Sequence, residues 1–290
     1  MLYNRIISIF ILIPIVISVL FFSSMMQFSI FLLSICLIGS WEWGKLMRFS
    51  FNMQCVWLST IFGLLLSMII IFFQNYWYCS NFWFIFFIFS IVIIVWWILV
   101  FLLVLFYPDS SIFWNNSNIL RFCFGVFMIF PFFCGVLILH QFNFIISSIL
   151  GKWWLLYILI VIWINDSSAY IIGQRLGKHK LLQNVSPKKT WEGCIGGILI
   201  STGIAWLMIK YHMRANVISS HMIFISFIGS ILFSIVGDLA ESMFKRESRV
   251  KDTNNLIPGH GGVLDRIDSL IAAIPIFVIL VLFLIYTKII

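Results

Sequence analysis

Charged residues are scarce in this 290-residue chain. They make up 10% of the sequence, whereas hydrophobic residues make up 62% and the mean hydropathy is +1.11. Because a soluble domain carries about 25% charged residues, this composition excludes a soluble globular protein. It predicts an all-α, polytopic integral membrane protein.

Cysteine pairs, a cleavage site and repeats are also missing. The six cysteines are scattered without a C-x-x-C pair, which argues against a disulfide or zinc framework and favours small buried side chains. The first apolar run begins at Ile6 and lacks a small-x-small cleavage site, so we interpret it as a retained span. The sequence has no internal repeat, long soluble loop or low-complexity linker.

Nine apolar runs are long enough to cross a bilayer, which takes about 20 residues. Their approximate limits are 6–22, 26–43, 55–73, 82–107, 119–143, 153–173, 193–210, 222–244 and 267–287. Residues 1–150 hold only Glu42 and Asp109 of the ten carboxylates. We therefore predict an N-terminal region of scaffold, lipid-facing or dimer-forming helices over 1–150. The catalytic region is expected over 151–290.

The basic residues predict the orientation. With the N-terminus in the cytoplasm, most of the 18 Lys and Arg residues fall in cytoplasmic segments. The polar loops 174–192 and 245–266 then both face the cytoplasm, as expected for a multi-pass protein of the inner (cytoplasmic) membrane. A net charge of +8 carried in short loops predicts contact with anionic lipid or phosphate groups rather than with nucleic acid.

The segment 237–269 holds most of the chain's acids and several bases. Asp238, Glu241, Ser242 and Lys245 follow the i, i+3, i+4, i+7 spacing of one helix face. A helix dipole would explain Asp268 at an N-terminus and Lys245 at a C-terminus. It does not explain Asp238, which lies about two turns inside its span, where a carboxylate is costly unless it is paired or metal-bound.

A glycine-rich turn, Pro258–Gly262, separates the two helices of this segment. Such a turn allows close backbone approach to a ligand, although His260 could also be only a hydrogen-bond partner within the turn. Carboxylates together with substrate phosphates are the usual surroundings of Mg²⁺. We therefore predict that Asp238 and Asp265 hold one Mg²⁺ jointly.

The loop 174–192 carries the second group of candidates. Asp166 and Tyr170, in the span before it, share one helix face, and a polar cleft whose lysines meet phosphate would use both. Ordinary positive-inside topology would also explain the lysines, and an interhelical hydrogen bond would explain Asp166. Ser186 and Thr190 resemble the capping start of the next span.

These groups suit one type of chemistry. Bringing two polyphosphate groups together requires metal, Lys and Arg cations around the transferring phosphorus. The sequence supplies such cations and shows no Ser-His-Asp or Cys-His arrangement. This balance favours activation of a phosphate over hydrolysis.

A family resemblance rests on the same residues. Residues 242–268 read S-M-F-K-R-E-S-R-V-K-D-T-N-N-L-I-P-G-H-G-G-V-L-D-R-I-D, and this segment closely resembles the signature of the phosphatidate cytidylyltransferases. D-S-S-A-Y-I-I-G and S-P-K-K-T-W-E-G resemble two further blocks of that family. The one departure is Asn254, where the family prefers Gly, Ser or Ala. Because Asn tolerates a left-handed backbone, we expect Asn254 to adopt that backbone and the turn shape to be kept.

The resemblance implies a helical membrane enzyme, dimeric, that converts CTP and phosphatidate into CDP-diacylglycerol and pyrophosphate with Mg²⁺, and with a monovalent cation such as K⁺ beside it. Asp238 and Asp265 would bind the metal. The catalytic residues implied are Ser242, Lys245, Arg246, Lys251, Asp252, His260, Arg266 and Asp268. The substrate-binding residues implied are Asp166, Tyr170, Ser186, Lys188, Lys189, Thr190, Glu192, Gly261 and Gly262.

Two other functions remain as alternatives. A CTP-dependent polyprenol kinase is a related membrane enzyme. A transporter also carries charged residues within its spans, but it usually shows internal inverted repeats. A CDP-alcohol phosphotransferase is disfavoured because its D-G-x-x-A-R motif is absent.

Overall fold

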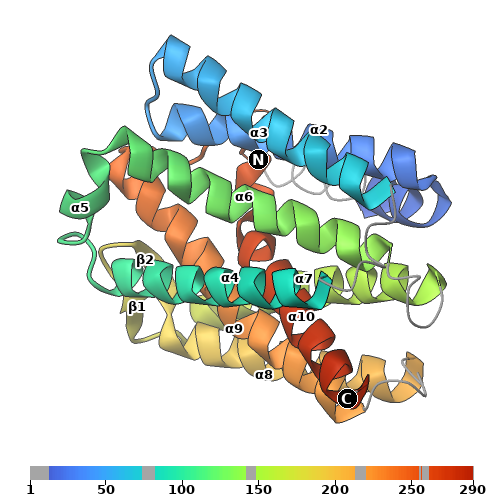
Figure 1. Cartoon of the computed structure of the whole chain (residues 1–290). Helices are drawn as coiled ribbons and strands as arrows, with labels where there is room; N and C mark the ends of the chain where they lie inside the picture. Colours follow the sequence, from blue (N-terminus) through green and yellow to red (C-terminus); the bar gives the residue numbers. More distant parts are fainter. Residues whose placement is uncertain are drawn as a thin grey trace.

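The computed structural model describes residues 13–73, 82–141, 148–212, 220–254, 256 and 261–289. These segments form a bundle of long helices with one small hairpin (Figure 1). The elements are α2 (Met25–Leu46), α3 (Phe51–Phe73), α4 (Phe82–Leu105), α5 (Ser111–Asn115), α6 (Asn118–His140), α7 (Ser148–Leu176), β1 (Lys180–Leu182), β2 (Ser186–Thr190), α8 (Trp191–His212), α9 (Ser220–Glu247) and α10 (Leu264–Ile289).

The predicted all-α membrane fold is confirmed. Within the described segments, eight helices are long and apolar enough to cross a membrane, and they correspond to the second to ninth predicted spans. The predicted span 6–22 lies partly outside the described residues, and its described part is a shorter apolar helix, Ile13–Phe22. The chain is therefore a multi-pass membrane protein.

The core runs along α9 and α10. Helix α10 buries an almost continuous row from Leu270 to Ile279, and it packs against α9, α6 and α2. By contrast, α3 and α4 expose many large apolar side chains, among them Phe84, Ile88 and Phe101. Apolar side chains on a spanning helix face lipid without the cost they would have in water. The C-terminal helices thus form the centre, and α3 and α4 lie at the periphery.

One end of the bundle is polar and is tied together across distant parts of the chain. Arg48, just after α2, donates to the Ser248 carbonyl at 2.9 Å, and Ser248 Oγ donates to the Leu46 carbonyl at 2.5 Å. Glu247, at the end of α9, accepts hydrogen bonds from Asn115 and Tyr107. The predicted loops 174–192 and 245–266 lie at this same end, so the alternation of the spans was predicted correctly.

The loop 174–192 contains two short strands that the sequence did not predict. It contains an antiparallel hairpin in which Lys180 pairs with Thr190 and Leu182 pairs with Ser186. Ser186 therefore belongs to a strand, and the prediction that it starts the next span is wrong. Thr190 provides the cap instead, because its Oγ1 accepts the Gly193 backbone N–H at 3.2 Å.

Small residues allow α7 and α8 to approach closely. A Cβ on Gly193 would lie 2.6 Å from the Ala169 carbonyl oxygen and 3.0 Å from the Gly173 Cα. A Cβ on Gly197, one turn further, would lie 2.9 Å from the Ala169 Cβ. Close approach through small residues is the usual means by which membrane helices associate.

This packing gives a test within one helix. Gly193→Ala should lower the thermal midpoint of the detergent-solubilised protein, because overpacking against backbone atoms costs about 1–3 kcal/mol. Gly203→Ala, also on α8, is the matched control, since a Cβ there meets nothing within 4 Å. Equal midpoints for the two variants would contradict the close α7–α8 contact.

Candidate functional site

A cavity of about 610 Å³ lies where the hairpin meets α7, α8 and α9. It contains six residues predicted from the sequence as site residues. The lining includes Asp166, Tyr170, Lys188, Lys189, Thr190 and Asp238. The structure thus brings together residues of the two polar segments, such as Lys189 and Asp238, although more than forty residues lie between them in the sequence.

Opposite charges meet within this cavity. Lys189 Nζ on β2 lies 2.5 Å from Asp238 Oδ2 on α9, and both side chains are about one-quarter exposed, at 29% and 26%. Asp166 on α7 lines the same cavity, and Asp166 and Asp268 on α10 both lie near enough to Asp238 for their charges to repel. Lys180 and Lys188 line the cavity as well, so cationic and anionic side chains are mixed on its wall.

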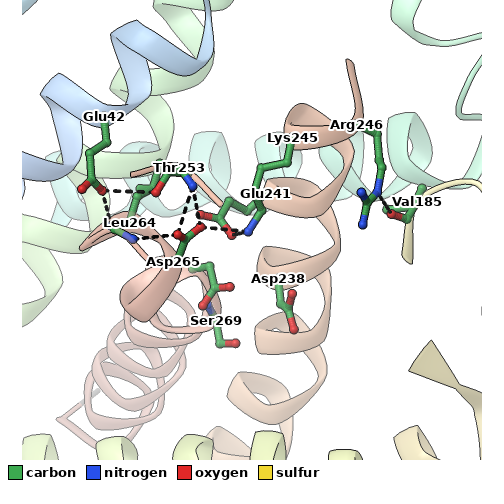
Figure 2. A network of polar contacts seen from close by, with 12 residues as sticks. Glu42, Val185, Asp238, Glu241, Lys245, Arg246, Thr253, Leu264, Asp265 and Ser269 are labelled. Atoms are coloured by element: carbon green, nitrogen blue, oxygen red, sulfur yellow. Dashed lines mark hydrogen bonds and ion pairs between the residues drawn. The ribbon is translucent and has the colours of Figure 1, made fainter. Parts of the chain in front are cut away.

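A second polar network lies nearer the polar end of α9 (Figure 2). Lys245 Nζ is 2.5 Å from Glu241 Oε2 and 3.0 Å from Asp265 Oδ1. Glu241 is fully buried, and Asp265 is 7% exposed. Lys245 thereby joins α9 to the first turn of α10 and offsets the cost of burying two carboxylates.

Asp265 also holds both ends of the loop 253–262, which we call the signature loop. Its Oδ2 accepts the Thr253 N–H at 3.0 Å and the Gly262 N–H at 2.8 Å. Gly261 has a φ of 82°, and a Cβ on it would lie 2.4 Å from Asp265 Oδ2. Only glycine allows this backbone to turn so close to the carboxylate.

Glu42 on α2 is a site residue that the sequence did not reveal. It is fully buried, and its carboxylate accepts the N–H groups of Val263 at 3.0 Å and Leu264 at 2.7 Å. Thr253 Oγ1 donates to it at 3.4 Å. Glu42 thus caps α10 from another helix, as Figure 2 shows. Its position near the end of a span, as one of two acids in residues 1–150, was the only signal in the sequence.

Gly262 lies against Glu42 and Thr253 rather than in the cavity lining. A Cβ there would lie 2.5 Å from Glu42 Oε2 and 2.2 Å from Thr253 Oγ1. The absence of a side chain is what lets the carboxylate reach the start of α10. Binding of substrate by Gly261 and Gly262 stays a prediction.

Two predicted residues attach the hairpin instead of lining the cavity. Arg246 points away from Lys245, and its Nε donates to the Val185 carbonyl at 3.1 Å (Figure 2). Glu192 accepts the His179 N–H at 3.2 Å and lies 2.7 Å from His179 Nδ1. Both contacts fix the strand that carries Lys188 and Lys189.

The remaining predicted residues that the structure describes do not line the cavity. Ser242 is half-buried on α9, whereas Lys251, Asp252 and Arg266 are exposed beside the signature loop. His260 lies outside the described residues. Non-glycine residues with positive φ in the described segments are Arg48 and Arg249. Asn254 is not among them, so the prediction of a left-handed backbone at Asn254 is wrong.

A divalent cation in this cavity stays a prediction. Among the described residues, no group of three or more His, Cys, Asp or Glu side chains is placed to hold a metal by itself. Mg²⁺ usually takes only one or two carboxylates and completes its shell with water and substrate phosphates. Asp238, which lines the cavity, suits that arrangement. Asp265 is turned toward Lys245 and the loop backbone.

The cap formed by Glu42 gives a second test. Glu42→Gln should lower both the thermal midpoint and the activity, because buried N–H groups that lose an anionic acceptor cost about 1–3 kcal/mol. Asp109→Asn, which changes the other acid of the N-terminal region at an exposed position, should stay within about 0.5 kcal/mol of the parent. An unchanged Glu42→Gln protein would show that the cap is not needed.

Comparison with known proteins agrees with this geometry. The model of the cytidylyltransferase family matches residues 3–284. The chain is 37% identical to a phosphatidate cytidylyltransferase of Haemophilus influenzae over 280 residues, which cover 96% of this chain and 97% of that protein. It is 34% identical to a phosphatidate cytidylyltransferase of Pseudomonas aeruginosa over 281 residues, or 96% of each chain. The chain belongs to the cytidylyltransferase family.

Proposed function

We propose that this protein transfers the CMP group of CTP to phosphatidate and releases pyrophosphate, which makes CDP-diacylglycerol for phospholipid synthesis. The observation that carries the proposal is the cavity at the polar end of a membrane bundle, which is lined by Lys188 and Lys189 of the hairpin and by Asp238 of α9, with Lys189 paired to Asp238. A water-soluble nucleotide and a lipid phosphate can both reach such a place. The full-length relatives support the same assignment.

The reaction joins two anions. A phosphate oxygen of phosphatidate forms a bond to the α-phosphorus of CTP, and the bond from that phosphorus to the bridging oxygen of the β-phosphate breaks. Pyrophosphate takes the electron pair and leaves. Phosphatidate is ionised already and needs little base catalysis, so the main task is to cancel charge repulsion.

The described cations are placed for that task. Lys188 and Lys189 line the cavity and would bind phosphate oxygens, while Lys245 holds Asp265 and the signature loop in place. Exposed Lys251 and Arg266 beside the loop would bind the outer phosphates. Asp238 would hold Mg²⁺, which supplies further charge neutralisation when bound. Joint binding by Asp265, and the K⁺ ion, stay predictions.

The assembly and the orientation are part of the proposal. We expect a homodimer in the inner membrane with the hairpin end in the cytoplasm, where CTP is made. The clustering of Arg48, Arg246, Arg249 and Lys251 at that end supports this orientation.

Labelled CTP decides between the candidate functions. With phosphatidate as the acceptor, a cytidylyltransferase places the label of [α-³²P]CTP in the lipid and releases the γ-label as pyrophosphate. A polyprenol kinase would instead place the γ-label in polyprenol. A transporter would place neither label in lipid. Absence of α-label from the lipid with active, folded protein would overturn the proposal.

Lys189 should be needed for turnover. Lys189→Met removes the partner of Asp238 and a phosphate ligand, and a lost charge-assisted contact of about 1.5–3 kcal/mol corresponds to roughly a ten- to hundredfold lower kcat/KM. Lys178→Met, in the same loop but outside the cavity lining, is the control and should keep near-parent kinetics. Similar losses in both variants would indicate a general charge effect.

Substitutions of Asp238 and Asp265 should differ in their effect on the thermal midpoint. Asp238→Asn should remove nearly all of the turnover at any Mg²⁺ concentration, although a measurable part should remain, and it should leave the thermal midpoint nearly unchanged. Asp265→Asn should lower turnover and also the midpoint, because its carboxylate holds Lys245 and the loop backbone. If the two residues share one Mg²⁺, the double variant should be scarcely less active than either single one. Multiplicative losses would exclude a shared ion.

A further inference from the structure

An apolar groove of about 620 Å³ opens on the outer face of α2 and α3, away from the polar cavity. Its lining is apolar apart from Ser59, whose hydroxyl is already bonded to the Cys55 carbonyl at 2.8 Å. The lining residues are Leu37, Ile38, Trp41, Leu58, Ser59, Phe62 and Leu256. The groove is thus formed by two spans and one residue of the signature loop.

The chemistry of the groove changes along α2. Leu37, Trp41 and Lys45 are spaced i, i+4, i+8, so they lie on one face over about 12 Å of helix. The face passes from aliphatic to aromatic to cationic, and Lys45 Nζ lies 3.5 Å from the centre of the Trp41 ring. A ligand that complements this face has a hydrocarbon chain at one end and an anionic group at the other.

Lys45 lies one helical turn beyond Trp41 of the groove lining, toward the polar end of the bundle. Arg48 follows Lys45 within one turn and donates to the Ser248 carbonyl, which places it beside Arg249 and the start of the signature loop. These basic side chains are exposed. A phosphate at this end would therefore lie between the groove and the loop.

The loop itself connects the groove to the candidate site. Leu256 lines the groove, and the loop that carries it is fixed at Thr253 and Gly262 by Asp265 and at Thr253 and Val263 by Glu42. Glu42 directly follows Trp41 on α2. The wall of the groove and the anchor of the loop are thus adjacent residues of one helix.

We propose that this groove binds one acyl chain of the phosphate-bearing lipid substrate and guides its phosphate past Lys45 toward the signature loop. The inference rests on the proposed function, because it assigns the lipid end of that reaction. The lipid in the groove has a small anionic phosphate headgroup, since a choline headgroup would bring a positive charge against Lys45 and Arg48.

Photolabelling tests binding without turnover. The full-length protein, in nanodiscs of phosphatidylcholine, is given phosphatidate or phosphatidylcholine with the same diazirine-bearing acyl chain, and labelled peptides are mapped by mass spectrometry. We expect phosphatidate to label the segment 58–62 several times more strongly than the choline lipid. Equal labelling would mean that only bulk lipid occupies the groove. Absence of labelling of 58–62 by either lipid would mean that no acyl chain enters the groove. Either result overturns the proposal.

A matched pair of serines on α3 tests the groove in the reaction. Ser59→Phe fills the groove, whereas Ser67→Phe adds the same side chain at an exposed position two turns away, where the serine is likewise bonded to its own helix, at 2.8 Å to the Leu64 carbonyl. Ser59→Phe should raise the KM for phosphatidate at least fivefold, leave the KM for CTP unchanged and remove the labelling preference. Ser67→Phe should change none of these.

The outcomes separate the two proposals. If the parent protein makes no CDP-lipid but phosphatidate still labels 58–62 preferentially, the reaction is wrong and the lipid groove stands. If the parent is active and Ser59→Phe behaves like Ser67→Phe, the groove is wrong and the reaction stands. A rise in the KM for CTP in Ser59→Phe would also contradict the groove, because it would indicate damage to the loop.

Discussion

The arrangement of the polar end depends on how this protein compensates buried carboxylates. Glu42, Glu241 and Asp265 are all buried; Lys245, one turn along the same helix, holds Glu241 and also reaches Asp265, and backbone N–H groups of the loop and of the start of α10 hold Asp265 and Glu42. An uncompensated charge in such surroundings costs several kcal/mol. The carboxylates therefore fix the geometry: α2, α9, α10 and the signature loop have to meet where those partners are. The same contacts fix the position of α9, which forms one wall of the cavity.

Much of this architecture could be predicted from the sequence because its causes are local. Apolar run lengths predicted eight helices that the structure confirms, and the spacing of Asp238 and Lys245 predicted a polar face on α9. The polar face of α9 and the basic loop 174–192 with the span before it led to residues that line one cavity, such as Asp166, Lys189 and Asp238, whereas no described residue of the signature 242–268 lines it. Pattern and composition are sufficient where a helix period or a span length decides the outcome.

The remainder could not be predicted because it depends on contacts between distant segments. Glu42 lies 222 residues before Leu264, and nothing near it in the sequence announces a helix N-terminus as its partner. The hairpin was missed because its strands are short and basic, and it is held by Arg246 and Glu192 rather than by an apolar core. Asn254 was expected to adopt a left-handed backbone on residue preference alone, whereas Gly261 takes that conformation.

The partnership of Glu42 with α10 has a consequence for the order in which the protein is made. During synthesis α2 enters the membrane long before Leu264 leaves the ribosome, so the Glu42 carboxylate at first lacks the backbone N–H groups that donate to it in the folded protein. Until α10 arrives, the N-terminal helices contain a destabilising charge. A chain truncated before α10 would keep that charge unmatched, so the stability of α2 in the membrane depends on the last span of the chain.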